Sequence, residues 1–180
     1  MIDRSAEAVA NFEAGCGCAQ AVFVAYAEDL GMDRDTAMKI SASFGSGMGR
    51  MREVCGCCSA MFLVAGMLTG ATDPKDRAAK THNYEVVRHL ADRFREKTGS
   101  IICREMLAGI YVANDGTAVP EERTEEFYKR RPCRELVRLA ATIIAEENDM
   151  VLFSPACKDQ ESDYEVRGNV FIDEVRKLGE

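Results

Sequence analysis

One stretch constrains the fold of this chain more than any other: residues 44–70, FGSGMGRMREVCGCCSAMFLVAGMLTG. Its second half is an almost uncharged apolar run, interrupted only by small residues such as Gly56, Ala60 and Gly66. A helix that is apolar on every side has to be buried, and small residues let neighbouring backbones come close. We therefore predict a central helix that is buried on all sides and surrounded by the other helices.

Three thiols stand at the start of this predicted helix, on Cys55, Cys57 and Cys58. The positive end of a helix dipole lowers the pKa of a thiol and favours the thiolate. Cys55 and Cys58 form a CxxC pair, and residues three apart are neighbours on a helix. This spacing is typical of redox dithiols and of metal chelation. The three cysteines are our candidates for redox-active thiols.

Three alternating glycines, Gly45, Gly47 and Gly49, precede the thiols. A dinucleotide-binding GxGxxG would need a further glycine at Arg50 or Arg52 and a preceding strand, and the sequence has neither. The glycines then have two interpretations. They bring backbone N–H groups close to an anion or a cluster, as cofactor-binding residues, or they form a flexible turn. The sequence leaves both open.

The remaining apolar residues recur at helical spacing. Cys18, Ala21, Val22 and Ala25, for example, fall at i, i+3, i+4 and i+7. No segment alternates like a strand and no hairpin signal occurs, so the predicted class is all-α. The length of 180 residues indicates one domain, 1–180, with a core at about 15–146 and a C-terminal helical extension at about 150–180. Besides the central helix, we predict helices at 3–14, 18–30, 33–43, 76–97, 101–111, 119–129, 133–147 and 163–178.

Composition excludes several classes of function. The formal charge of −7 argues against a nucleic-acid partner, which needs a basic face. No apolar run is long enough for a membrane span, and the acidic N-terminal segment does not resemble a signal peptide. We therefore expect a cytoplasmic protein. In that reducing compartment, eight cysteines favour metal or redox chemistry over structural disulfides, although free cysteines also pack as small apolar residues.

Four cysteines share a position in the pattern. Cys18, Cys55, Cys103 and Cys133 each begin a predicted helix in line with its apolar stripe, so their thiols could converge in a shared core. Four thiols are the ligand set of a tetrahedral zinc site or of an iron–sulfur cluster, and they could also form two dithiol/disulfide pairs. Cys157 lies outside this scheme, and we expect its replacement by Ser to leave cofactor loading and redox activity nearly intact.

The order of these residues resembles a known family. The segments are GCAQA at 17–21, GMGR at 47–50, CG at 55–56, CREML at 103–107 and Cys133. Together they resemble the C_GCAxxG_C_C family of "putative redox-active" proteins, which are mostly small and helical and carry four cysteines with a CGAxxG motif. The resemblance covers about residues 15–146 and implies the same four cysteines. The chain departs from the motif at 55–60, which read CGCCSA.

These observations lead to a primary hypothesis and two alternatives. The primary hypothesis is electron transfer through an iron–sulfur cluster held by Cys18, Cys55, Cys103 and Cys133. The alternatives are a metal-free thiol/disulfide redox protein, and a helical module that binds zinc or another metal without redox turnover. The sequence names no redox partner protein and leaves enzymatic activity and homo-oligomer formation open.

Overall fold

A computed structural model describes residues 1–110 and 117–148 of the chain. Within those ranges the protein is all-α, and no strand occurs there. The elements are α1 (Ser5–Glu13), α2 (Cys18–Ala25), α3 (Arg34–Ala42), α4 (Gly45–Met48), α5 (Gly56–Thr69), α6 (Arg77–Thr98), α7 (Cys103–Met106), α8 (Glu125–Arg130) and α9 (Cys133–Asn148). The predicted helix at 163–178 and Cys157 lie outside the described residues.

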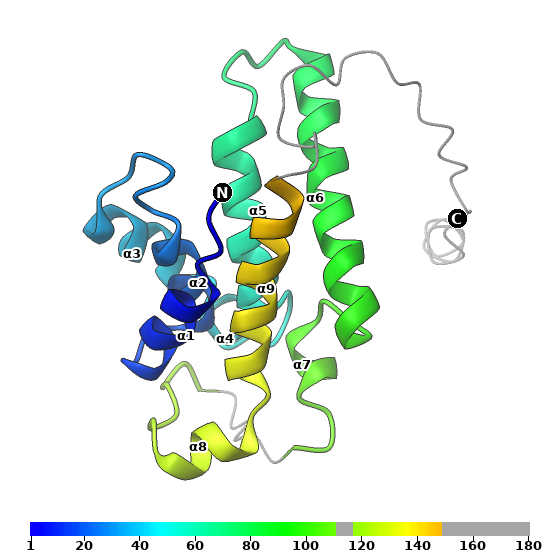
Figure 1. Cartoon of the computed structure of the whole chain (residues 1–180). Helices are drawn as coiled ribbons and strands as arrows, with labels where there is room; N and C mark the ends of the chain where they lie inside the picture. Colours follow the sequence, from blue (N-terminus) through cyan, green and yellow to red (C-terminus); the bar gives the residue numbers. More distant parts are fainter. Residues whose placement is uncertain (111–116, 149–180) are drawn as a thin grey trace, which may run out of the picture.

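Helix α5 occupies the centre of the molecule, between α2, α6 and α9 (Figure 1). Its first half is buried, and Met61 and Val64 are fully enclosed. The prediction of burial on all sides is wrong for its last turns, where Met67 is 50% exposed and Leu68 37%. The C-terminal turns of α5 therefore face solvent in part.

The N-terminal helices pack on one side of this centre. Helix α2 contacts α1, α3, α5 and α9, and its Tyr26 hydroxyl donates a 2.7 Å hydrogen bond to the carbonyl of Ala141 in α9. Both Tyr26 and Phe23 are fully buried. The predicted helix at 18–30 ends earlier, at Ala25, because the next backbone N–H groups bond to the third preceding carbonyl and the chain tightens into turns.

Local chemistry sets several helix ends where the sequence places them. Asp33 accepts a hydrogen bond from the Thr36 N–H and caps α3, and Asp76 caps α6 in the same way. Gly99 ends α6 with a φ of 82°, a left-handed conformation that glycine adopts without steric cost. The predicted helix at 119–129 is shorter than expected and begins only after Thr124, whose side chain accepts from the Phe127 N–H.

The predicted helix at 101–111 is wrong, and only Cys103–Met106 is helical. The backbone before it is held by a second segment instead. The Cys55 N–H donates to the Ile101 carbonyl at 2.8 Å, and the Cys103 N–H donates to the Glu53 carbonyl at 2.7 Å. Because the Ile101 carbonyl and the Cys103 N–H are bonded to this second segment, the helix begins only at Cys103, and the Ile102 carbonyl accepts its first helical bond from the Met106 N–H at 3.1 Å. Val54 and Ile102 form an isolated antiparallel bridge here.

An ion-pair cluster joins α6 to α9. The Glu147 side chain is fully buried, and its carboxylate contacts His89 Nε2 at 2.9 Å and the guanidinium of Arg93. A buried carboxylate is tolerated only with such partners. The contact fixes α9 along α6 and so fixes the position of its first residue, Cys133. In the part of the chain that the structure describes, no helix is both long enough and apolar enough to cross a membrane.

Candidate functional site

The four cysteines predicted as ligands stand at the beginnings of helices, as predicted. Cys18, Cys103 and Cys133 are the first residues of α2, α7 and α9, and Cys55 is the N-cap of α5. Cys55 and Cys103 are buried, and Cys18 and Cys133 are half-buried. In Figure 1 these four helix ends lie at the same end of the bundle, near α4 and α8.

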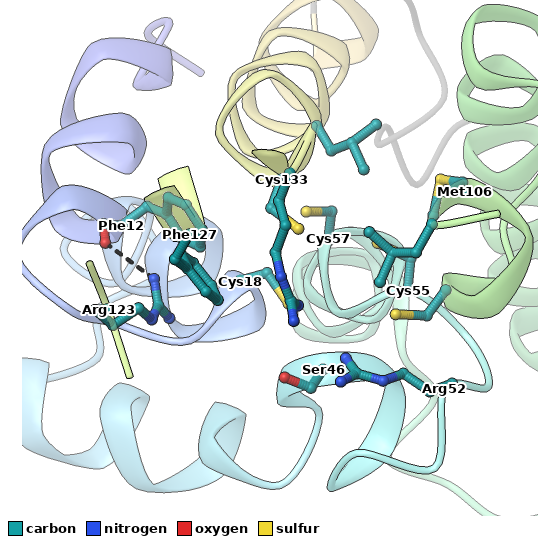
Figure 2. Close-up of a pocket in the computed structure, with 14 residues that line it drawn as sticks. Phe12, Cys18, Ser46, Arg52, Cys55, Cys57, Met106, Arg123, Phe127 and Cys133 are labelled. Carbon is teal, nitrogen blue, oxygen red and sulfur yellow. Dashed lines mark hydrogen bonds between the residues drawn. The ribbon is translucent and has the colours of Figure 1, made fainter. Parts of the chain in front are cut away.

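A small internal cavity of about 30 Å³ lies where these helices begin. All four predicted ligands line it, together with Cys57, and Figure 2 shows Cys18, Cys57 and Cys133 gathered around the start of α5. The full lining is Phe12, Cys18, Ser46, Arg52, Cys55, Cys57, Cys103, Met106, Leu107, Arg123, Phe127, Arg131, Cys133 and Leu136. The structure thus brings five thiols to one cavity, while Cys16 and Cys58 are outside the lining.

Gly56 allows α2 and α5 to approach each other at the cavity. A Cβ added to Gly56 would lie 2.5 Å from the Cys18 Sγ, 2.8 Å from the Phe44 carbonyl oxygen and 3.1 Å from the Ala19 nitrogen. Real Cβ atoms do not come that close to other atoms. The glycine therefore places the Cys18 thiol against the first turn of α5.

The glycine segment forms an unusual wall of the site. Ser46, Gly47, Met48, Gly49 and Arg50 have φ values between 55° and 71°, a left-handed run that includes three residues other than glycine. Each such residue costs roughly 1–2 kcal/mol. Within this segment Ser46 lines the cavity, and none of the three predicted glycines does.

The three predicted glycines therefore differ in what they do. Gly47 is sterically required, because an added Cβ would lie 2.7 Å from the Cys103 Cβ and 2.9 Å from the Arg52 Cα. Gly49 has a φ of 62°, whereas Gly45 has open space around it and no positive φ. Their binding to a cofactor remains a prediction.

Two of the clustered thiols are stabilised as thiolates. The pKa of Cys55 is held well below its ordinary value, mainly by hydrogen bonds from the thiols of Cys57 and Cys58 and then by their backbone N–H groups, against the effect of burial. The pKa of Cys18 is lowered chiefly by the Cys57 thiol, with backbone N–H groups of Ser46 and Ala19 adding to it. A hydrogen bond donated to the charged form favours that form.

The other thiols of the site are held neutral. The pKa values of Cys57 and Cys58 are raised because their protons are shared with the thiolate of Cys55, and for Cys57 also with that of Cys18. Burial raises the pKa of Cys103 to about 11 and that of Cys133 to about 12. The hydrogen bonds of the cluster therefore favour the thiolate at Cys55 and Cys18 and the protonated thiol at the other positions.

Sequence reasoning missed the arginines of the site. Arg52, Arg123 and Arg131 line the cavity; Arg52 and Arg131 stand outside the predicted helices, and Arg123 stands within the one predicted at 119–129. Arg123 donates to the Cys16 carbonyl at 2.9 Å, and its guanidinium lies 4.6 Å from the ring centroid of Phe12. The only sequence signal was the number of arginines flanking cysteines, which by itself does not place a side chain in a cavity.

The metal ligand set remains a prediction. All seven cysteines that the structure describes are free thiols, and within residues 1–110 and 117–148 no group of three or more Cys, His, Asp or Glu side chains is placed so that it could hold a metal ion.

A comparison with protein families decides the family. The model of the C_GCAxxG_C_C family, described as "Putative redox-active protein", matches residues 16–147. The chain belongs to this family. The match spans most of the chain and includes every cysteine described above, whereas Cys157 lies beyond it. No curated protein and no solved structure matches the chain in the corresponding searches.

Proposed function

We propose that this protein is a thiol/disulfide redox protein in which Cys55 is the attacking thiolate and Cys58 the resolving thiol. The observation that carries the proposal is the lowered pKa of Cys55, the N-cap of α5, caused by hydrogen bonds from the thiols of Cys57 and Cys58 in the first turn of that helix. The thiolate is the nucleophile in disulfide exchange, and Cys55 and Cys58 have CxxC spacing. The family description as redox-active supports the same class of function.

The chemistry requires a disulfide as oxidant, supplied by a partner protein or a small molecule. The Cys55 thiolate attacks one sulfur of that disulfide and releases the first partner thiolate. Cys58 then loses its proton to that thiolate and attacks the Cys55 sulfur, which releases the second partner thiolate. The protein ends with a Cys55–Cys58 disulfide, and two electrons have passed to the partner. Cys57, which also donates to Cys55, is the alternative resolving thiol.

A second candidate is electron transfer through an iron–sulfur cluster held by Cys18, Cys55, Cys103 and Cys133. The support for it is that these four thiols line one cavity, since thiolate sulfur is the ligand that such clusters require. A bound cluster would supply one-electron transfer. The cavity volume of about 30 Å³ takes only two or three water-sized groups, so a cluster would require these side chains to move apart.

Two measurements separate these functions. Protein purified anaerobically is analysed for iron, zinc and acid-labile sulfide, and the apoprotein is then treated with glutathione disulfide and mapped by mass spectrometry. We expect no stoichiometric metal and a Cys55–Cys58 disulfide that dithiothreitol reverses. Stoichiometric iron and sulfide would instead establish the cluster, and stoichiometric zinc without reversible oxidation would establish a non-redox metal module.

Substitutions provide the controls. Cys55→Ser and the triple Ser variant at Cys55, Cys57 and Cys58 should lose reversible oxidation, because the nucleophile is removed. Cys16→Ser is the matched control, since Cys16 is buried outside the cavity, where its thiol contacts the Met38 sulfur at 3.9 Å. If the triple variant is oxidised and reduced like the parent, the proposed function is wrong.

A further inference from the structure

The cavity contains a buried arginine, Arg52, whose side chain hydrogen-bonds to the Cys103 thiol and still leaves one donor unused. Arg52 is 7% exposed and lines the cavity, and its Nη1 atom has no hydrogen-bond partner among the described residues. Leaving a buried charged donor unsatisfied costs several kcal/mol or more, so such groups are normally paired. Its backbone is held in place by the Arg104 N–H, which donates to the Arg52 carbonyl at 3.0 Å.

The other two arginines of the cavity are partly satisfied. Arg131, with a side chain 5% exposed, pairs through Nη2 with Glu121 and stacks 4.5 Å from the Phe127 ring centroid, but its buried Nε has no partner in the described part of the chain. Arg123 donates to two backbone carbonyls. Arg52 and Arg131 therefore retain unused donors at the cavity.

The rest of the lining adds positive potential. Helices α2, α5 and α9 all begin at the cavity, and the N-terminus of a helix of this length attracts negative charge. Of the described residues that line the cavity, none is Asp or Glu. In a chain with a net charge of −7, this concentration of positive charge is local and specific to the site.

The size of the cavity limits the anion. About 30 Å³ holds two or three water-sized groups, which suits a compact oxyanion. Ser46 offers a hydroxyl, and Figure 2 shows Ser46 and Arg52 on the same side of the cavity, below Cys18 in that view. A guanidinium and a hydroxyl are suitable donors for an oxyanion.

We propose that Arg52, Arg131 and Ser46 form a binding site for a small inorganic oxyanion of about the size of sulfate, beside the Cys55 thiol. The site is independent of the disulfide exchange proposed above, in which the oxidant is a disulfide and not an oxyanion. Binding itself requires only the arginines and the hydroxyl, so it can be tested separately.

The test is equilibrium dialysis of the reduced full-length protein against radiolabelled sulfate, with ionic strength held constant by chloride. We expect one saturable site in the parent, affinity at least tenfold weaker in Arg52→Gln, and partial recovery in Arg52→Lys. Arg104→Gln is the matched control and should bind like the parent, because Arg104 is 55% exposed and pairs with Glu53 outside the cavity. No saturable binding in the parent, or unchanged affinity in Arg52→Gln, would overturn the proposal.

Two further arms keep this result separate from the redox function. Cys55→Ser should keep the sulfate affinity within a few-fold of the parent while it loses reversible oxidation. If instead Cys55→Ser abolishes binding, the arginines are not the site. If the Arg52 variants fail to fold, a measurement on the parent alone still tests the site. Saturating sulfate should slow the alkylation of Cys55 by iodoacetate, but not that of Cys16. Equal rates with and without sulfate contradict the proposed site.

Discussion

Replacing Gly56 by Ala tests the close approach of α2 and α5 that builds the thiol cluster. At an ordinary helical position, Gly→Ala stabilises a protein by about 0.4–1 kcal/mol because it restricts the unfolded chain. At Gly56 the new methyl group would lie 2.8 Å from the Phe44 carbonyl oxygen and 3.1 Å from the Ala19 nitrogen. These are backbone atoms, so no rotation of a side chain relieves the overlap.

The sign of the effect follows from the two magnitudes. Overpacking of this kind costs about 1–3 kcal/mol, which exceeds the entropic gain, so Gly56→Ala should lower the free energy of unfolding by about 1–2 kcal/mol. Gly66 is the matched control in the same helix, because its added Cβ meets nothing within 4 Å. Gly66→Ala should therefore stabilise the protein by about 0.4–1 kcal/mol.

Urea denaturation and thermal denaturation, both followed by far-UV circular dichroism in the presence of a reductant, measure both variants. The two midpoints should move in opposite directions, and the two melting temperatures should differ by about 4–10 °C for a chain of this size. If Gly56→Ala is as stable as Gly66→Ala, the first turn of α5 does not contact the start of α2 as described, and the arrangement of thiols built on it fails as well.

Three further predictions concern stability. Tyr26→Phe should cost about 1–3 kcal/mol in urea denaturation, because it leaves the buried carbonyl of Ala141 without its donor; an unchanged midpoint would show that water replaces the hydroxyl. Because the folded pKa values of Cys103 and Cys133 are about 11 and about 12, above the ordinary value of 9.0, the thiols ionise first in the unfolded state, and the free energy of unfolding should fall as pH rises from 9 to 11. Cys133→Ala should make that fall shallower, and an identical slope would contradict the assignment. Asp76→Ala should destabilise the protein by about 0.5–2 kcal/mol through loss of the α6 cap, measured in the same assay with Asp76→Asn as the variant that retains a capping oxygen.

A pH-rate profile provides the fifth prediction. Hydrogen bonds stabilise the thiolate of Cys55 and disfavour its protonated form, so its alkylation by iodoacetamide should reach half its maximum rate at a pH below the ordinary thiol pKa of 9.0. Replacing Cys58 by Ala removes one donor and should move that midpoint upward. An unmoved midpoint would mean that Cys58 does not donate to Cys55.

The sequence by itself determined the features that depend on near neighbours along the chain. Asp33 begins α3 because its side chain accepts a hydrogen bond from a free backbone N–H at the start of the helix. Gly99 ends α6 because it adopts the left-handed conformation there. Both effects are independent of the rest of the fold. The cysteines could be placed at helix starts because Cys18, Cys55 and Cys133 head apolar stripes, and the family resemblance followed from the same residues. Periodicity and capping are local properties, so a one-dimensional pattern contains them.

Only the tertiary structure decided how these elements meet. Residues 101–102 stand outside the helix that begins at Cys103 because the backbone near Cys55 bonds to the Ile101 carbonyl and the Cys103 N–H from a segment far away in sequence. Whether Cys55 is a thiolate and Cys58 a thiol depends on which proton each sulfur shares, and Arg52 enters the cavity from a left-handed segment in which it has a φ of 62°. Hydrogen bonds, burial and charge act through space, over a few ångströms, between residues that the linear sequence separates. For that reason the set of thiols could be anticipated from the sequence, whereas their protonation and the buried arginine beside them could not.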